Sequence, residues 1–455
     1  MKRYVLLAVL ACVAGCRHEL PPSADGRKDV PMKLVDVRPF DMGKPDAVLL
    51  LTGGTNGMME VCNCSGPMPG GLSRRSGLVE SYRKSFPDAM LIDVGDAFWV
   101  EPSAVRNEYM LKGYEQIGYD AVVLGDQEWA AGRKRLAKML RANKTPALSS
   151  TVCAPDVPAM RVFKRELPNG TKLAVVSETT GEAFHFVPGS VKRTLTFSPE
   201  DETEKRIEGL KIQGYVVVLV AHTVEKDVEK IAARTKADVV VRANTTKTGK
   251  KLVKVGDTPV IKIGGHDYVA AVAIKADGSK MTALEYRPEL VDTTWPINGS
   301  LLLTYQAYAH DAMRRALDAE RTEGLAYQSS ESCGKCHEKQ LENWKTTHHA
   351  RAWATLQKVK RTSDPACVMC HTSGFGTKKG FYTFEKTPNL ANVNCQDCHR
   401  FNQDEHRKKG FEYRKVSREL CQTCHTPVTD PKFDFDKKRK MIRCPADDEQ
   451  TASVR

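Results

Sequence analysis

The chain has no long apolar run beyond its first residues. After Tyr4–Ala14, no stretch approaches the roughly 20 consecutive apolar residues that a membrane-spanning helix needs. The apolar run at Tyr215–Ala221 has the length of a buried strand instead. This absence excludes a transmembrane domain, so we expect the mature chain to be soluble.

The N-terminus nevertheless predicts attachment to a membrane. Lys2 and Arg3 precede the apolar run, and the sequence "VAGC" ends it at Cys16. This segment resembles the lipobox of bacterial lipoproteins, which implies cleavage before Cys16 and acylation of its thiol. A signal peptide that is cut elsewhere, with Cys16 discarded, is the alternative. We expect residues 1–16 to be a signal, residues 17–45 a proline-dotted tether, and the protein to be exported and lipid-anchored to the bacterial cell envelope, facing the periplasm.

Cysteine usage sets the last third of the chain apart, because eight of the 14 cysteines fall in four C-x-x-C-H units there. C-x-x-C-H is the attachment motif for c-type haem, in which two thiols bond the vinyl groups and the histidine becomes an axial iron ligand. A closed zinc site would pair C-x-x-C units and would not explain the recurring histidine. We therefore predict four covalently bound c-type haems. The attachment residues are Cys333, Cys336, His337, Cys367, Cys370, His371, Cys395, Cys398, His399, Cys421, Cys424 and His425.

The region that carries these motifs has little strand pattern and few residues. It spends about 30 residues on each motif, too few to build a core from side chains alone. We therefore expect the haems to form the core of a mainly α module, residues 328–455. Residues 331–455 carry 24 Lys and Arg against 16 Asp and Glu, an excess that haem propionates would neutralise. The net charge of +13 therefore gives no support to nucleic-acid binding.

The histidine pair at residues 348 and 349 is a candidate source of further iron ligands. Apolar residues recur at helical spacing from Leu341 to Leu356, which predicts that His337 and His348 share one helix. At 1.5 Å per residue these two would stand about 16 Å apart, whereas two nitrogens on one iron lie about 4 Å apart. Unless the helix breaks, His348 or His349 must reach a neighbouring haem. A solvated histidine pair is the alternative.

Two more histidines are candidate distal ligands. His406 follows His399 by seven residues. His310 lies on a predicted helix after the cap signal at Asn298, on the same stripe as Leu303, although a lone histidine on such a face is more often packed in a core. Four irons thus have three or four candidate distal histidines, so at least one iron is a candidate for an open coordination position.

This part of the chain resembles the tetrahaem cytochrome family typified by cytochrome c-554, over residues 328–444. The segments that carry the resemblance are, in order, "SCGKCHEKQLENWKTTHHARAW", "DPACVMCHTSGFG", "VNCQDCH" and "LCQTCHT". The resemblance implies that His349 is a haem ligand and retains a histidine at His406, but without the Gly-Pro-Gly turn usual there. Cys444 stands where a last ligand histidine is expected, so either that haem lacks a sixth ligand or Cys444 supplies a thiolate. Members of the family mostly carry electrons between periplasmic enzymes.

Residues 46–290 predict a layered α/β domain, and residues 291–327 a helical linker. Short β-rich runs alternate there with helical stretches. The expected strands are 47–52, 90–94, 121–124, 173–177, 216–220, 239–241, 260–263 and 270–275. The expected helices fall near 75–85, 105–117, 132–143 and 223–235.

Six segments of this domain, among them "LLLTGGTNG", "LIDVGDAF" and "GYDAVVLGDQEW", resemble the calcineurin-type metallophosphoesterase domain of periplasmic nucleotidases. The resemblance implies two divalent metals that activate water and bind a phosphoryl group. Most of the family's ligand positions are changed, and they carry Gly54, Asn56, Gln127, Asn244 and Thr246. The ligands that remain are Asp96, Asp126 and His222. We expect either one weakly bound divalent metal or solvated and core-packed remnants.

The sequence "EVCNC" places Cys62 and Cys64 on a loop that, in this fold, overhangs the old active site. The pair is either a redox disulfide, a metal clip or a loop staple, the last of these through Cys153; export permits disulfides. The neighbouring Arg74 and Arg75 either face an anion or are solvated.

These features together predict a membrane-anchored, exported tetrahaem cytochrome that transfers electrons between periplasmic or envelope redox proteins. One alternative is a redox enzyme acting on a small nitrogen or sulfur compound at a five-coordinate haem. The other is a residual metal-dependent phosphoesterase or nucleotidase, which the lost ligands disfavour. In the leading hypothesis the N-terminal domain is a platform that docks or presents a substrate to the haem module.

Overall fold

The computed structural model describes residues 32–62, 66–100, 104–406, 408, 411, 416–426, 429–430 and 432–445. The predicted signal and the lipidation candidate Cys16 lie outside these residues, as does Cys64. No helix within the described ranges combines the length and the hydropathy needed to cross a membrane.

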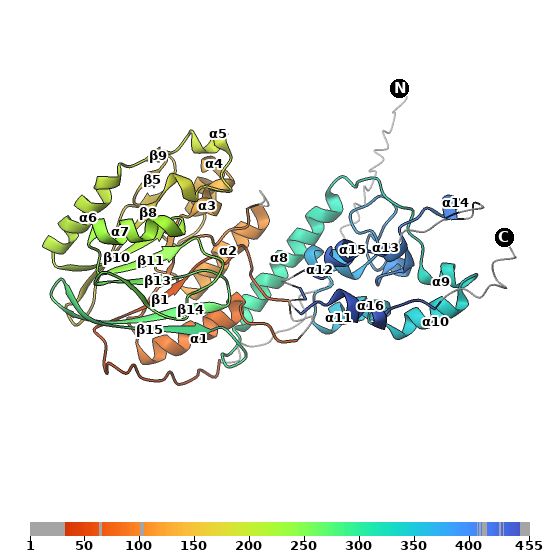
Figure 1. Ribbon diagram of the computed structural model, residues 1–455, viewed down its shortest axis with the longest axis horizontal. Helices are drawn as coiled ribbons and strands as arrows, with labels where there is room; N and C mark the ends of the chain where they lie inside the picture. The colour runs from red at the N-terminus through yellow and green to blue at the C-terminus, as the bar shows by residue number, and fades with distance from the viewer. Residues whose placement is uncertain are drawn as a thin grey trace, which may run out of the picture. The chain divides into compact units, whose positions relative to one another are not determined.

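Two sheets form the framework of the N-terminal part (Figure 1). The first has the order β15-β14-β1-β2-β3-β4-β6, and the second β12-β13-β11-β10-β8-β7. The strands of the first sheet are β1 (Ala47–Thr52), β2 (Met90–Asp93), β3 (Ala121–Val123), β4 (Ala147–Leu148), β6 (Ala159–Met160), β14 (Tyr268–Asp277) and β15 (Lys280–Leu290). Those of the second are β7 (Phe163–Glu166), β8 (Lys172–Thr179), β10 (Tyr215–His222), β11 (Val239–Ala243), β12 (Val253–Val255) and β13 (Thr258–Lys262). A small pair, β5 (Val152–Cys153) and β9 (Thr196–Phe197), lies apart.

Hydrophobic side chains of the two sheets meet in a shared core. Alternate residues of β1 point to opposite sides, so Leu49 and Leu51 join this core while Val48 and Leu50 join the cluster under the helices. Figure 1 shows helices on the outer side of each sheet. The first sheet is covered by α1 (Leu72–Ser85), α2 (Ala104–Ile117) and α8 (Gly299–Asp318), and the second by α6 (Glu200–Ile212) and α7 (Val228–Thr235). The layers therefore run helix, sheet, sheet, helix.

The sequence pattern predicted most of this architecture. Each of the eight expected strands coincides with an observed strand, and the four expected helices coincide with α1, α2, α4 (Arg133–Arg141) and α7. Strand β15 and helix α6 were not predicted. β15 contains Pro288 and lies at the edge of its sheet, half-exposed along its length, so its residues do not form an apolar run.

Residues 35–42 fall within the range that the sequence predicts to be a tether, but they pack on the domain. Phe40 is 3% exposed in the core beneath the helices. Arg287 lies 4.3 Å from the Phe40 ring centroid and donates to the carbonyls of Arg38 and Pro39 at 2.8 and 2.9 Å. The buried aromatic ring and these hydrogen bonds place the start of the folded region before residue 40.

Helix α8 occupies the predicted linker and begins where the cap signal predicted. The Asn298 side chain accepts hydrogen bonds from the backbone N–H groups of Ser300 and Leu301. The predicted buried stripe is wrong, because Leu303 is 64% exposed and His310 is also exposed. The buried stripe consists of Leu301, Tyr305, Tyr308 and Ala309.

The C-terminal part is helical, with short elements. These are α9 (Ser330–Gly334), α10 (Glu338–Thr346), α11 (Ala352–Lys358), α12 (Pro365–His371), α13 (Cys395–His399), α14 (Gln403–His406), α15 (Arg418–Gln422) and α16 (Phe435–Met441). Among the described residues, the buried hydrophobic cluster of this part consists of Trp353, Leu356, Val368, Phe381, Leu390 and Ala391. So small a cluster is not enough to form the core of this part by itself, which agrees with the prediction that haem contributes to the core.

Candidate functional sites

The four C-x-x-C-H motifs have the same local form. Each lies on a short helix or its end, so that the two cysteines and the histidine share one turn. In the first motif the His337 N–H donates to the Cys333 carbonyl at 3.0 Å, and in the fourth the His425 N–H donates to the Cys421 carbonyl at 2.9 Å. This turn presents both thiols and the imidazole together, as covalent attachment of one haem requires.

Cysteines of different motifs meet in two pairs. The thiol of Cys333 in the first motif lies close enough to that of Cys395 in the third to lower the pKa of Cys395. The thiol of Cys370 in the second motif likewise lies close enough to that of Cys424 in the fourth to lower the pKa of Cys424. Groups attached at these cysteines therefore lie next to one another, first with third and second with fourth.

Two pairs of histidine rings face one another at the distance that a shared iron requires. The ring centroids of His337 and His406 are 5.7 Å apart, and those of His349 and His425 are 6.2 Å apart. Two imidazoles with iron–nitrogen bonds of about 2 Å place their ring centroids roughly 6 Å apart. The donor set and its spacing therefore fit c-type haem: His337 with His406 would hold one iron, and His425 with His349 would hold another.

The predicted helix through the histidine pair is broken. Helix α10 ends at Thr346, Thr347 is extended, and a short 3-10 turn at His349–Arg351 precedes α11. The prediction that His337 and His348 share one helix is therefore wrong. The break aims the two histidines differently: His348 is exposed, whereas the half-buried His349 reaches the fourth motif.

Hydrogen bonds and burial prepare several of these rings to bind a metal. Nδ1 of His371 lies 2.6 Å from the Ala352 carbonyl and that of His425 lies 2.9 Å from the Asp430 carboxylate, which leaves Nε2 of each ring for iron. Burial, with the neighbouring histidines, lowers the pKa of His349 to about 4. Burial likewise lowers the pKa of His371 and of His399. Low pKa values keep these imidazoles neutral at physiological pH, which is the form that binds a metal.

A buried asparagine that sequence reasoning missed joins the first and third motifs. Asn394, 2% exposed, accepts from the backbone and side chain of Ser330 at 3.0 and 2.9 Å and donates to Ser373 at 2.9 Å. Ser373 in turn donates to Asp397 at 2.5 Å. The position of Asn394 directly before a C-x-x-C-H unit was the one sequence signal that could have identified this residue.

Cys444 lies at the third motif. Gln340 and Asn343 of α10 donate to the carbonyls of Pro445 and Arg443, both at 3.2 Å, and so fix the residues on either side of Cys444. The charge of Cys444 is one of the influences, after burial, that raise the pKa of the half-buried Cys398 thiol. The position that the resemblance assigns to a last ligand histidine therefore lies within electrostatic range of the third motif.

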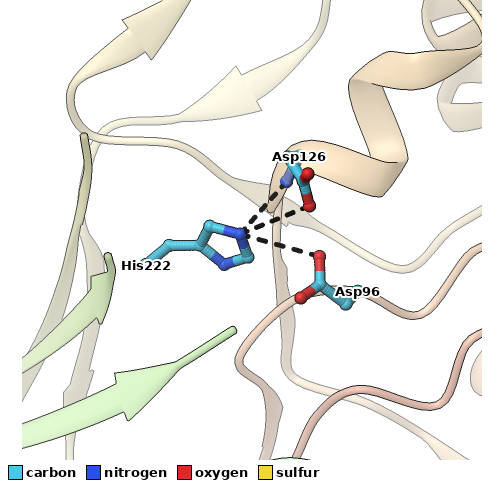
Figure 2. Close-up of side chains that lie close together, drawn as sticks. All are labelled: Asp96, Asp126 and His222. Carbon is cyan, nitrogen blue, oxygen red and sulfur yellow. Dashed lines mark hydrogen bonds and ion pairs between the residues drawn. The ribbon is translucent and has the colours of Figure 1, made fainter. Parts of the chain in front are cut away.

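The three retained phosphoesterase ligands converge on one point (Figure 2). Asp96 follows β2, Asp126 begins α3 (Asp126–Ala130) after β3, and His222 ends β10. His222 Nε2 lies 3.7 Å from an oxygen of Asp96 and 3.5 Å from an oxygen of Asp126. All three side chains are buried, and their candidate ligand atoms lie within 4.8 Å of one another.

This cluster has the character of a small cation site. One carboxylate oxygen of Asp96, one of Asp126 and Nδ1 of His222 are buried without a hydrogen-bond partner. Burial and the nearby charge of Asp126 raise the pKa of Asp96, while the adjacent His222 imidazole lowers the pKa of Asp126. A divalent cation would satisfy these carboxylate oxygens, so the residues fit one ion.

The changed ligand positions bond to one another instead of pointing to a metal. The Gln127 amide donates to the Asn56 side chain at 2.6 Å, and the Asn56 amide donates to the Gly54 carbonyl at 2.8 Å. Gly54 has no side chain and a φ of +62°, so it contributes no ligand. Among the described residues, the cluster therefore holds three ligands, too few for the two-metal centre that the family uses.

The interpretation of Arg75 as an anion-facing or solvated residue is wrong. Its side chain is 0% exposed and donates to Thr55 and Tyr119 at 3.0 and 3.1 Å. The hydroxyl of Tyr114 accepts from Arg75 and donates to the buried carboxylate of Asp93 at 2.8 Å. Arg75 is thus the counter-charge of a buried aspartate. Arg74 is half-exposed and donates to the Asp292 carbonyl at 3.3 Å.

Cys62 is disulfide-bonded, whereas Cys153 carries a free thiol. The predicted staple through Cys153 is therefore wrong. The chain before Cys62 is held in place, since Val61 is 3% exposed and a carboxylate oxygen of Glu60 accepts from the Ser73 N–H at 2.9 Å.

Comparison with known sequences identifies the C-terminal part. Residues 332–400 match the sequence family described as cytochrome c554 and c-prime. Cytochrome c-554 of Nitrosomonas europaea is 33% identical over 172 residues, an alignment that takes in 26% of this chain and 73% of that protein.

Comparison with solved structures identifies the fold of the N-terminal part. Sulfate thiohydrolase SoxB of Thermus thermophilus aligns with a TM-score of 0.51 at 18% identity, and covers 60% of this chain and 61% of that one. A 5′-nucleotidase precursor of the same species aligns with a TM-score of 0.52 at 17% identity, and covers 69% and 68%. The chain thus spans less than two thirds of SoxB. At these identities the similarity shows the fold alone, and it confirms the predicted metallophosphoesterase-like architecture.

Proposed function

Since the chain belongs to the cytochrome c-554 family, we propose that it is a membrane-anchored, exported tetrahaem cytochrome that transfers electrons between redox proteins of the cell envelope. The family match supports haem electron transfer. The observation that carries the proposal is the pairing of His337 with His406 and of His349 with His425 at the spacing of bis-histidine iron. The thiol pairs between motifs support it further, because haems in contact pass electrons readily.

Haem content and anchoring are tested on protein from a host that matures c-type cytochromes. A pyridine haemochrome assay should give four haems per chain, one for each motif. Replacement of Cys16 by serine should move the protein from the membrane fraction to the soluble fraction. Absence of a Soret band, or fewer than four haems per chain, would contradict the proposal.

A second candidate function is chemistry on a small nitrogen or sulfur compound at the haem of the second motif. One observation favours it: among the described residues, no second histidine ring contacts His371, while its Nδ1 is held by Ala352. An iron bound by His371 alone keeps a coordination position for a small ligand. Carbon monoxide should then bind one ferrous haem per chain, and no binding would exclude this function.

The N-terminal domain is proposed as a platform that binds one divalent ion weakly at Asp96, Asp126 and His222. The mutual hydrogen bonds of Gln127, Asn56 and Gly54 argue against a working phosphoesterase. Assay of phosphodiesters and nucleotides with added manganese tests this view, and turnover that is lost in Asp96→Ala would reverse it.

A further inference from the structure

A strongly basic segment follows the fourth C-x-x-C-H motif. Residues 432–443 carry six basic and two acidic side chains, and four of the basic ones are consecutive, at positions 437–440 of α16. All four are exposed. Apart from Lys438, whose Nζ lies 3.6 Å from Asp430, these four side chains form no ion pair with a described residue. The segment therefore presents a positive charge that the described part of the chain leaves largely uncompensated.

Both ends of this segment are held in place. At its start, the Asp434 side chain caps α16, and the Arg418 guanidinium lies over the Phe435 ring at 5.1 Å. At its end, Asn343 of α10 donates to the Arg443 carbonyl at 3.2 Å. The basic side chains therefore extend from a helix of defined position.

The segment also lies against the fourth haem attachment site. The ring of Phe433 stacks on that of His425, with centroids 4.7 Å apart and an angle of 16° between the ring planes. The carboxylate of Asp430, a residue only 7% exposed, lies 2.9 Å from Nδ1 of His425 and 3.6 Å from Nζ of Lys438. One buried carboxylate therefore separates an exposed lysine from the histidine that would bind the iron.

We propose that this basic face of α16 is the docking site for an acidic redox protein, which exchanges electrons with the haem of the fourth motif. The inference rests on the proposed function, because it requires the haems. In an encounter that reduces this chain, the redox group of the partner loses one electron and the ferric iron becomes ferrous. No bond is formed and no proton moves. Complementary charge steers such encounters, and makes them fast and dependent on salt.

The side chains of this face favour a protein partner over a membrane surface. Met441 directly follows the basic run and is 64% exposed, and methionine is enriched where proteins meet. A helix that binds within a membrane surface needs a free apolar face. The Phe435 ring is instead covered by the guanidiniums of Arg418 and Arg439, which lie 5.1 and 5.9 Å from its centroid. A lipid headgroup, moreover, neither gives nor takes electrons.

The test is stopped-flow reduction of the haem-loaded full chain by flavodoxin hydroquinone, an acidic protein reductant that gives single electrons from its flavin. The test variant combines Lys437→Glu with Lys440→Glu, which makes the segment neutral. The control variant combines Lys134→Glu with Lys138→Glu on exposed positions of α4, and it changes the net charge of the chain equally. At low ionic strength we expect the test variant to be reduced about tenfold more slowly than the natural chain, and the control variant at the natural rate. Added salt should shrink the difference.

A small reductant separates docking from damage to the haems. Lumiflavin semiquinone, which is uncharged, should reduce all three proteins at the same rate. The natural chain gives a second readout, because its rate with flavodoxin must fall as ionic strength rises. A rate that is independent of salt, or equal flavodoxin rates in the three proteins, would overturn the inference and leave the electron-transfer function standing. A chain without haem absorbance would remove both.

Sedimentation with phosphatidylglycerol vesicles tests the membrane as the alternative partner. It is measured on full chains that carry Cys16→Ser, so that an acyl anchor does not contribute. We expect the Lys437→Glu, Lys440→Glu change to leave sedimentation unchanged. If this change instead abolishes sedimentation and leaves the flavodoxin rate unchanged, the basic face binds a membrane and the inference is wrong.

Discussion

At the scale of single residues, the adjacent histidines 348 and 349 have different surroundings, so one can serve as the control for the other. His349 faces His425 with ring centroids 6.2 Å apart, and His348 is exposed. Replacing His349 by alanine should open one coordination position on the haem of the fourth motif, because no other described histidine ring contacts His425. Electron paramagnetic resonance should then show one low-spin haem converted to high spin.

The His348→Ala variant is the control for this prediction. It removes an imidazole of the same size one residue away, and should leave the spin state of every haem unchanged. If both variants change the spectrum equally, the ligand role of His349 is wrong.

The Asp96, Asp126 and His222 cluster predicts a cation-dependent stability. An ion that binds only the folded state at ten times its Kd stabilises that state by about 1.4 kcal/mol. Manganese should therefore raise the melting temperature of the natural chain, and Asp96→Ala should abolish the increase. Equal increases in both proteins would show that the ion binds elsewhere.

A buried charge pair makes Arg75 essential for stability and Arg74 dispensable. Replacing Arg75 by alanine leaves the Asp93 carboxylate buried without its counter-charge, which costs about 3–5 kcal/mol. Replacing the half-exposed Arg74 should change the free energy of unfolding by less than about 0.5 kcal/mol. Urea denaturation of the two variants measures the difference, and equal stabilities would contradict the assigned network.

At the scale of elements, helix α1 packs so closely that a glycine is required. A Cβ on Gly77 would lie 1.9 Å from the Pro296 carbonyl oxygen, whereas a Cβ on Gly209 of α6 would meet nothing within 4 Å. Gly77→Ala should therefore destabilise the protein by about 1–3 kcal/mol through overpacking. Gly209→Ala should stabilise it by about 0.5–1 kcal/mol, because alanine is the better helix former. Destabilisation of both variants in urea denaturation would refute this account.

The type of an element, helix or strand, could be predicted from the sequence where the apolar pattern arises from a single element. The strands β1, β8 and β10 are buried on both sides, and their continuous apolar runs identify them. The apolar pattern from Leu341 to Leu356 arises from two helices, α10 and α11, with a break at Thr347 between them. The sequence therefore predicted one helix where the structure has two. The buried face of α8 could not be predicted either, because two tyrosines and an alanine accompany the single leucine of its buried stripe.

At the scale of the whole molecule, the two halves differ in how much their sequences reveal. The four C-x-x-C-H units specify covalent chemistry by spacing alone, so the attachment residues were predicted without a fold. The proximity of cysteines from different motifs, such as Cys333 and Cys395, could not be predicted, because it depends on how distant segments pack. The same limit hid Arg361, which donates a hydrogen bond to the Val61 carbonyl, 300 residues away along the chain.

The small hydrophobic cluster of the C-terminal part predicts that haem is needed for its folding. The cluster around Trp353 has few buried residues, whereas the N-terminal part has large cores between its layers. In a host that does not mature cytochromes, trypsin should degrade the chain beyond about residue 327 and spare the N-terminal part, since a region with so little apolar core does not fold alone. Mass mapping of the fragments measures this, with the haem-loaded chain as the control. If the haem-free C-terminal part resists trypsin as well as the haem-loaded one, its side chains form a sufficient core. Haem is then not required for this part to fold.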